Sequence, residues 1–221
     1  MTLKVKTLTP VETTAHQEKE KLILQTARKR FGHYGYSKVT MDEVAEDIGV
    51  VKGAIYYYFP TKEKLFEAVI RQELRQFTEE IQKMLHEKHS YPDLIYSYVK
   101  KRQQFFRGLA NLSQLDYPSW TRIKSTFRDL FETFESEELT FLQQIFQEGH
   151  RSGEFAALDS RGLANLMLHS LQGLYLRTMR NASHGELNDE ICSQLEAEMK
   201  FFARIFVSGI TNTTKEKRNK P

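Results

Sequence analysis

The sequence predicts an all-α protein, and three observations carry this prediction. Apolar residues recur at spacings of three and four over long stretches, only 5 prolines occur in 221 residues, and two short helices with a glycine corner can be recognised near residue 50. With 40% hydrophobic residues, a chain of this length can bury a sizeable core. We expect about nine helices, arranged as a flexible N-terminal arm (1–16), a small helical domain with the glycine corner (17–66), a larger C-terminal domain (67–211) and a polar basic tail (212–221).

A short amphipathic helix is predicted to begin at Thr40. The Thr40 hydroxyl can accept a hydrogen bond from the backbone N–H of Glu43, and the Glu43 carboxylate can accept one from Thr40 in return, which is a capping box. Val44 and Ile48 lie one turn apart on the apolar face of this helix. Gly49 then permits the left-handed conformation that turns the chain sharply. The segment is therefore the first half of a helix-turn-helix.

A second short helix is predicted at 51–57. Ile55 and Phe59 are four residues apart and point inward, while the first turn carries small residues that let the backbone approach the wall of a DNA groove. The face that is left to meet DNA carries Lys52, Gly53, Ala54, Tyr56 and Tyr57.

The residues around this motif separate it from a plain helical corner that binds no nucleic acid. They are Ile23, Leu24, Ala27, Phe31, Gly35, Thr40, Gly49, Val50, Gly53, Ile55, Tyr56, Tyr58, Phe59, Lys62 and Leu65. In this combination, residues 20–66 resemble the DNA-binding domain of the TetR (tetracycline-repressor-like) transcription regulators. Beyond Leu65 the resemblance is one of size and layout.

The resemblance implies a role for each matched residue. Thr40 is expected to contact a phosphate, Lys62 to anchor another, and the helix from Lys52 to be the recognition helix. The DNA-binding residues it implies are Thr40, Lys52, Gly53, Ala54, Tyr56, Tyr57 and Lys62. Val51 stands where family members usually have Ser or Thr, and valine can neither cap a helix nor bind a phosphate. The operator sequence therefore cannot be transferred from relatives.

Charge gives this interpretation modest support. The net charge of +3 falls in the first 64 residues, which hold 11 basic and 8 acidic side chains. A surplus this small predicts weak non-specific DNA binding and reliance on geometry and dimerisation. No run of about 18 apolar residues is present and the polar N-terminus has no signal-peptide core, so a cytoplasmic protein without membrane contact is expected.

The C-terminal domain is predicted to hold an effector cavity. Helices are expected at 61–88, 92–110, 120–134 and 136–151, and aromatic residues are dense among them. These rings can simply fill the core, but the resemblance implies a cavity for a small lipophilic or aromatic effector. Arg102 is either an anchor for a ligand carboxylate or a solvated surface side chain. The candidate lining residues are Tyr98, Arg102, Phe105, Leu109, Trp120, Phe127, Phe131 and Phe141.

The last two helices are predicted to form the seam of a homodimer. They follow a turn at 149–155, and each carries an apolar stripe that can pair with its copy in a four-helix bundle. Burial of the same stripes inside one chain is the alternative. The seam residues expected are Leu163, Met167, Ser170, Leu174, Leu195, Met199, Phe202 and Phe206.

Features of an enzyme or a metal protein are weak. The GxSxG and glycine-rich phosphate motifs are absent, and no cofactor is predicted. His86 and His89 could hold a metal, but no third ligand is placed beside them. Cys192 fits a small core or interface residue better than a redox sensor.

These observations together predict a homodimeric, ligand-responsive transcription regulator. We expect a repressor that binds a palindromic operator and releases it when the effector enters the C-terminal domain. An activator, a regulator that needs a co-ligand to bind DNA, and a helical adaptor that no longer binds DNA are the alternatives.

Overall fold

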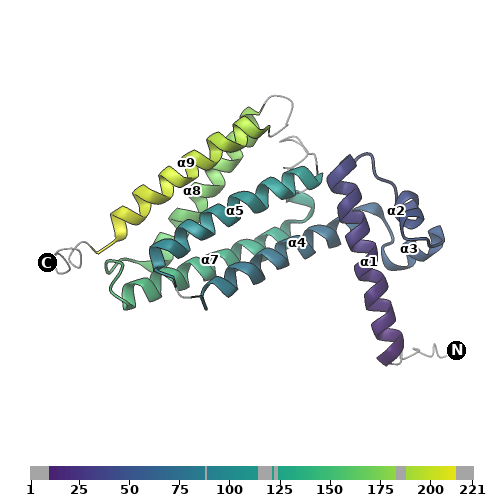
Figure 1. Ribbon diagram of the computed structural model, residues 1–221, viewed down its shortest axis with the longest axis horizontal. Coiled ribbons are helices and arrows are strands. Elements are labelled where there is room, and N and C mark those ends of the chain that lie inside the picture. The colour runs from purple at the N-terminus through teal and green to yellow at the C-terminus, as the bar shows by residue number, and fades with distance from the viewer. Residues whose placement is uncertain (1–9, 88, 114–120, 122–123, 183–187, 213–221) are drawn as a thin grey trace. The chain divides into compact units, whose positions relative to one another are not determined.

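The computed structural model describes residues 10–87, 89–113, 121, 124–182 and 188–212 (Figure 1). Within these residues the secondary structure is helical, with no β-strand, which confirms the all-α prediction. Residues 121 and 124–126 are also helical. The bounded helices are α1 (Pro10–Tyr34), α2 (Met41–Asp47), α3 (Lys52–Tyr58), α4 (Lys62–Met84), α5 (Tyr91–Ser113), α7 (Arg128–Arg151), α8 (Ser160–Asn181) and α9 (Asp189–Ile210).

The chain divides into two compact units, residues 1–71 and 72–221. In the first unit, Ile23, Ala27 and Phe31 on one face of α1 are buried, and Phe31 meets the ring of Phe66 edge-on at 5.0 Å. Helix α1 ends where Gly35 takes a positive φ of 79°, a conformation that glycine adopts without steric cost. The buried apolar side chains from α1 to the first turns of α4 are Ile23, Ala27, Phe31, Val39, Met41, Val44, Ala45, Ile55, Phe59, Leu65, Phe66, Val69 and Ile70.

The start of α1 differs from the prediction. The arm expected at 1–16 overlaps the helix, which already begins at Pro10, whereas residues 1–9 lie outside the described part. Proline suits the first helical turn because its missing N–H would have no partner there and its φ is already helical. Nothing between Pro10 and His16 breaks a helix, so the lack of apolar periodicity was a misleading signal.

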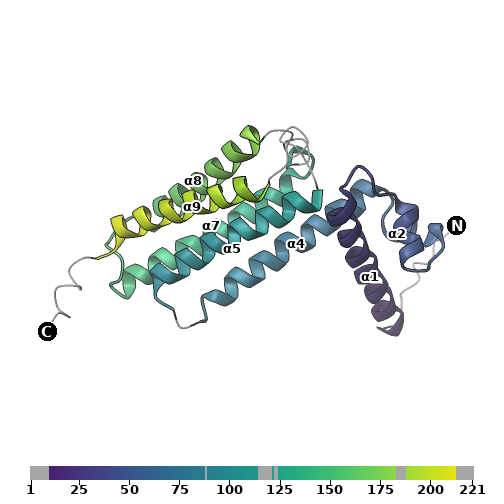
Figure 2. The ribbon, with the colours of Figure 1, turned by 45° about the horizontal axis from the view of Figure 1, so that its top comes forward.

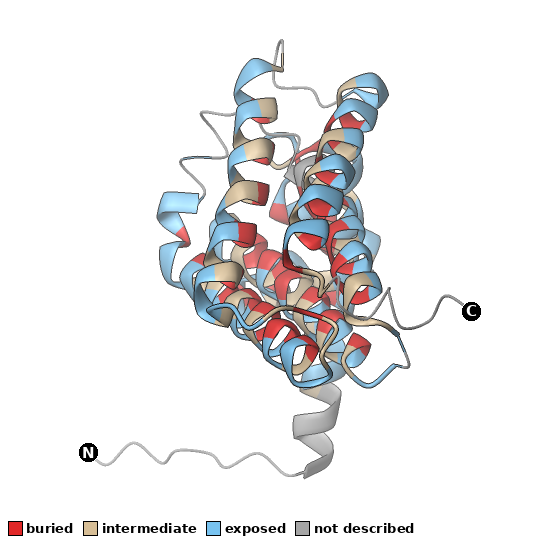
Figure 3. Ribbon diagram, turned by 90° about the vertical axis from the view of Figure 1, so that its left-hand side faces the viewer, coloured by how far each residue is buried: buried red, intermediate tan, exposed pale blue. Residues whose placement is uncertain are grey.

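In the second unit, α5, α7, α8 and α9 run alongside one another (Figures 1 and 2). Their buried residues face inward and their exposed residues outward (Figure 3). Large apolar side chains fill the interior, and most of them come from the 3.6-residue stripes that the sequence shows. Over the described residues, no helix is both long enough and apolar enough to span a membrane.

Helix α7 is longer than predicted. The sequence suggested one helix at 120–134 and another from Ser136, but α7 is continuous from Arg128, and the break falls at Phe127. No glycine or proline separates Phe134 from Ser136, and the Ser136 carbonyl accepts a hydrogen bond from the Thr140 hydroxyl within the helix. The chain therefore has no physical reason to stop there.

The predicted turn after α7 is confirmed, and two glycines make it possible. Gly153 has a φ of 77°. A Cβ atom on Gly149 would lie 2.2 Å from Phe155, so the close approach of this ring requires glycine. Phe155 forms a single antiparallel bridge with Thr211, which ties the turn to the end of α9.

Candidate DNA interface and effector cavity

The start of α2 has the predicted capping box. The Thr40 hydroxyl accepts a hydrogen bond from Glu43 N at 3.3 Å, and the Glu43 carboxylate accepts one from Thr40 N at 2.8 Å. Hydrogen bonds from Thr40 lower the pKa of Glu43. Arg30 of α1 holds the other end of α2 through both oxygens of Asp47, at 2.5 and 2.6 Å. The Arg30–Asp47 pair therefore attaches the C-terminal end of α2 to α1.

Helix α3 presents the predicted outward face. Gly49 has a φ of 67°, as expected for the corner, and Ile55 and Phe59 are buried. Tyr57 is the more exposed of the two predicted groove-facing tyrosines, at 73%, and Tyr56 is exposed as well. Gly53 has open space around it, which leaves the backbone accessible.

Val51 at the start of α3 makes no side-chain cap, as its chemistry requires. Because of this, the first turn of α3 depends on backbone bonds alone, such as the one from Ala54 N to Val51 O at 2.8 Å. The recognition helix is therefore anchored by its buried face and not by its N-terminus.

The two predicted phosphate-binding lysines have partners in the protein. Lys52 Nζ lies 2.5 Å from Asp42 Oδ2, and both side chains are exposed. Lys62, the first residue of α4, donates to the carbonyl of Tyr36 at 3.1 Å, and its ammonium lies 4.6 Å from the centre of the Tyr36 ring. Surface pairs of the Lys52 type contribute little stability, so a phosphate can replace the carboxylate at small cost.

One neighbour of the recognition helix was missed by sequence reasoning. The imidazole of His16 stacks on the Tyr58 ring at 4.5 Å and meets the Tyr57 ring edge-on at 5.9 Å. The sequence placed His16 at the end of the flexible N-terminal arm. Only the continuation of α1 to Pro10 brings it to the end of α3.

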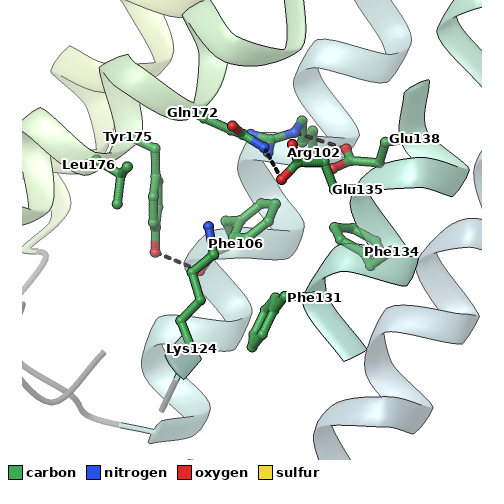
Figure 4. Close-up of a pocket in the computed structure, with 10 residues that line it drawn as sticks. All are labelled: Arg102, Phe106, Lys124, Phe131, Phe134, Glu135, Glu138, Gln172, Tyr175 and Leu176. Atoms are coloured by element: carbon green, nitrogen blue, oxygen red, sulfur yellow. Dashed lines mark hydrogen bonds and ion pairs between the residues drawn. The ribbon is translucent and has the colours of Figure 1, made fainter. Parts of the chain in front are cut away.

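The second unit holds a small cavity among α5, α7 and α8, with a volume of about 40 Å³ (Figure 4). This is room for about one to three water molecules, whereas ligand sites usually enclose several hundred Å³. An effector must therefore displace side chains to enter. The lining residues are Arg102, Phe106, Lys124, Phe131, Phe134, Glu135, Glu138, Gln172, Tyr175 and Leu176.

A buried polar cluster lies at this cavity. The Tyr98 hydroxyl and Arg102 Nε both donate to Oε1 of Glu138, at 2.7 and 2.9 Å. All three side chains are buried. Burial and the Glu138 charge raise the pKa of the Tyr98 hydroxyl well above its ordinary value, so this group remains a donor.

The predicted lining is only partly gathered at the cavity. Arg102 and Phe131 line it, but Phe105, Leu109, Phe127 and Phe141 are not among its lining residues, and Trp120 lies outside the described part. The expectation that Arg102 is a solvated surface side chain is wrong, because Arg102 is buried against Glu138. Tyr98 reaches the site through its bond to Glu138.

Sequence reasoning missed Glu138, which sits in an acidic run with Glu135 and Glu137. A signal was nevertheless present. Phe134, Glu138, Phe141 and Ile145 recur at spacings of three and four, so they share one face of α7, and that face is buried. An acid in a buried stripe must find a partner, which here is Arg102.

The predicted dimer stripe is partly wrong. Met167 of α8 and Leu195 and Met199 of α9 are each less than 5% exposed, because these residues pack into the core of their own chain. Five of the predicted residues are half-buried, namely Leu163, Ser170, Leu174, Phe202 and Phe206. The large apolar side chains exposed on these helices are instead Leu166, Phe201 and Ile205, at 58%, 60% and 58%.

The side chains proposed for other chemistry lie apart from these sites. Cys192 is buried, and burial raises the pKa of its thiol, which opposes the thiolate that redox sensing needs. His86 and His89 follow the end of α4, and His89 lies 3.0 Å from Glu87. In the described ranges, no group of three or more potential metal ligands gathers.

Comparison with known proteins identifies relatives over most of the chain. Residues 23–69 match the family model of bacterial regulatory proteins, tetR family. A transcriptional regulator from Cytophaga hutchinsonii is 35% identical over 88% of this chain and 99% of its own, with a TM-score of 0.83. The uncharacterised regulator YhgD of Bacillus subtilis is 27% identical over 68% of this chain and 79% of its own. FadR of B. subtilis, solved with stearoyl-CoA, is 23% identical, with a TM-score of 0.60 over 86% of this chain and 98% of its own.

Proposed function

Because the chain belongs to the TetR family of bacterial regulatory proteins, it is a DNA-binding transcription regulator, and we propose that it is a homodimeric repressor released by a small-molecule effector. The observation that carries the proposal is the face of α3. Lys52, Tyr56 and Tyr57 project from a helix whose opposite side is buried, on a corner that Gly49 and the capping box fix. Such a face can enter the major groove while the first unit keeps its shape.

The remaining predicted residues suit contacts with the DNA backbone. Thr40 and Lys62 stand at the starts of α2 and α4, where hydroxyl, ammonium and backbone N–H groups can meet phosphates. Gly53 and Ala54 keep the first turn of α3 small enough for close approach. Phosphate contacts position a reader, whereas Tyr56 and Tyr57 supply the contacts to base edges and methyl groups.

The dimer seam that we propose combines the exposed apolar residues of α8 and α9 with half-buried residues beside them. These helices are antiparallel neighbours (Figure 1), and the ion pair between Arg177 and Glu198 sets their register. With this pair side by side, Leu174 comes level with Phe201, and we infer that the exposed apolar residues of the two helices share one surface. That surface carries Leu163, Leu166, Ser170, Leu174, Phe201, Phe202 and Ile205, and a second copy can cover it as a four-helix bundle.

The effector site that we propose is the cavity among α5, α7 and α8. Four aromatic rings line it, which suits a partly apolar ligand. A ligand larger than the cavity must shift these helices. If the shifted helices favour a different arrangement of the dimer, the distance between its two recognition helices changes. Half-sites lie roughly 34–36 Å apart in such readers, so a change in spacing abolishes simultaneous contact.

The experiment that tests the function is selection of bound sequences from random duplex DNA with the purified full chain, at low and physiological salt. We expect an inverted repeat with half-sites about one helical turn apart. A variant with Tyr56→Ala and Tyr57→Ala should select nothing while remaining folded. If the native protein, folded and dimeric, also enriches no sequence, the DNA-binding proposal fails, and the co-ligand and adaptor alternatives take its place. We also expect the protein to work in the cytoplasm, where bacterial operators lie.

A further inference from the structure

Glu138 has a carboxylate oxygen that the described residues leave without a hydrogen-bond partner. Its Oε1 accepts hydrogen bonds from Tyr98 and Arg102, but its Oε2 is buried and accepts none from the part of the chain that the structure describes. The whole side chain is only 1% exposed. A buried acceptor of this kind costs about 1–3 kcal/mol, and more when it is charged. Folded proteins tolerate such a cost most readily at a functional position.

Glu138 also lines the cavity proposed for the effector (Figure 4). A carboxylate oxygen can only accept hydrogen bonds. The group that satisfies it must therefore donate, and a positively charged N–H donor makes the strongest bond of this type. A carboxylate or phosphate on the ligand would meet the Glu138 charge at close range.

The charges of the lining point the same way. Lys124 is exposed, so water screens its ammonium. The lining as a whole holds two basic and two acidic residues, and with the exposed Lys124 set aside, Glu135, Glu138 and Arg102 leave one negative charge. Arg102 is already paired with Glu138, and therefore it is not available as the carboxylate anchor that the sequence suggested.

The apolar part of the lining also favours a cation. The cavity is bounded by the rings of Phe106, Phe131, Phe134 and Tyr175. The faces of aromatic rings attract cations, and Arg102 already lies 4.5 Å from the centre of the Phe106 ring. A ligand ammonium would find the same environment on the other walls.

We propose that the effector is an organic cation with an N–H donor, a protonated amine on an apolar body, whose nitrogen donates to Oε2 of Glu138. This inference rests on the proposed function, since it names the chemical class that the effector site takes. Glu138 is the binding residue, and Tyr98 and Arg102 are positioning residues because they hold its other oxygen.

The test compares three probes that share one alkyl chain, namely hexylamine, trimethylhexylammonium and hexanoate. Binding to the full-length protein is measured by titration calorimetry near neutral pH. We expect hexylamine to bind at least about tenfold more tightly than hexanoate, because one charge-assisted hydrogen bond is gained and one repulsion is avoided. The trimethylated cation, which has no N–H, should bind more weakly than hexylamine.

Two variants locate the effect. Glu138→Gln should reduce hexylamine affinity by at least about tenfold, whereas Glu137→Gln, the same change on the neighbouring exposed residue of α7, should leave it unchanged. If Glu138→Gln does not fold, the three probes on the native protein still decide the matter. The proposal is overturned if hexylamine does not bind, if hexanoate or the trimethylated cation binds as tightly, or if folded Glu138→Gln retains native affinity.

DNA selection on the same preparation separates this inference from the proposed function. If the protein selects an inverted repeat but binds hexanoate more tightly, it is a regulator, and the proposal of an amine effector is wrong. If the protein binds hexylamine through Glu138 but selects no DNA sequence, the cation site is supported and the proposed operator binding is wrong.

Discussion

Arg102 of α5 and Glu138 of α7 form a buried ion pair, with Arg102 Nε 2.9 Å from Glu138 Oε1. The Arg102 guanidinium is also over the Phe106 ring. Burial is the largest single influence and lowers the pKa of Arg102, but the charge of Glu138, the Tyr98 oxygen and the hydrogen bonds to both together outweigh it, and the pKa is raised. A pair enclosed in this way behaves as a unit, because either charge left alone would be uncompensated in a medium of low dielectric constant.

Replacing Arg102 with Met should destabilise the protein by about 3–5 kcal/mol, since Glu138 would remain as an unpaired buried charge. Adding Glu138→Gln to this variant should recover most of that stability, because the Gln oxygen can still accept from Tyr98. Chemical unfolding of the two single variants and the double variant measures the coupling. A double variant that is no more stable than Arg102→Met would mean that packing of the arginine stem, and not its charge, is what matters.

Replacing Tyr56 with Phe should weaken operator binding by about 2- to 10-fold, the effect of removing one hydrogen bond. The ring is retained, so dimerisation and stability should not change. Affinity is measured by fluorescence anisotropy with the selected operator. Tyr96→Phe is the matched control, because Tyr96 is an exposed tyrosine of the second unit. Equal affinity of Tyr56→Phe and the native protein would remove Tyr56 from the interface.

The pair between Lys52 and Asp42 predicts opposite effects of two substitutions. Lys52→Ala should weaken binding to all DNA sequences and reduce the slope of log K against log salt by about 0.9 for each phosphate that the variant no longer neutralises. Asp42→Asn should strengthen binding, because it frees the ammonium and removes a negative charge near the phosphates. Titrations at several salt concentrations give both quantities. Weaker binding by Asp42→Asn would show that the carboxylate positions Lys52 for DNA.

The proposed seam predicts that Leu166→Glu disrupts the dimer. A charge placed on this apolar surface would have to be buried without a partner when the second copy docks. Leu158→Glu is the control, since Leu158 has a similar exposure of 48% but lies before α8. Light scattering over a concentration series gives the mass of each variant. If the two variants have the same mass as the native protein, the seam lies elsewhere.

Because Arg30 attaches α2 to α1 through Asp47, the stability of the protein should depend on pH in the acid range. Hydrogen bonds from Arg30 lower the pKa of Asp47 in the folded state, so the folded protein binds the Asp47 proton less readily than the unfolded chain. The stabilisation is therefore present above the ordinary aspartate pKa of about 4 and is lost as the pH falls through the lower, folded value. Thermal unfolding at a series of pH values should show a smaller decrease in stability below about pH 4 for Asp47→Asn than for the native protein. Glu46→Gln, a change of the same kind on the exposed neighbour, should follow the native curve.

The DNA-binding unit could be predicted closely from sequence because its signals are local. The capping box needs only Thr40 and Glu43, and the corner needs only Gly49. The boundary at Phe127 could not be predicted in this way, because no glycine or proline marks it. Helices that end for tertiary reasons give no signal in the chain itself.

The seam and the cavity depend on which face of each helix meets which neighbour. Helix α9 carries Leu195 and Met199 on one side and Phe201 and Ile205 on another, and both sides are apolar in the sequence. Periodicity shows that stripes exist, but only packing reveals that the first pair is buried in its own chain. The burial of Glu138 could not be predicted for the same reason, since it depends on α5 as much as on α7.

Val51 leaves the first turn of the recognition helix without a side-chain cap, and this affects the affinity and the lifetime of the DNA complex. The amides of Lys52 and Gly53 have no side-chain acceptor at the cap, so this turn can open locally at little cost and exchange its amide hydrogens rapidly. Contact with a DNA phosphate would order this first turn. Part of the binding free energy is then used to order the helix, which lowers affinity and makes association more sensitive to temperature. A Ser at position 51 would supply the missing acceptor in advance, and the protein would stay longer on its operator.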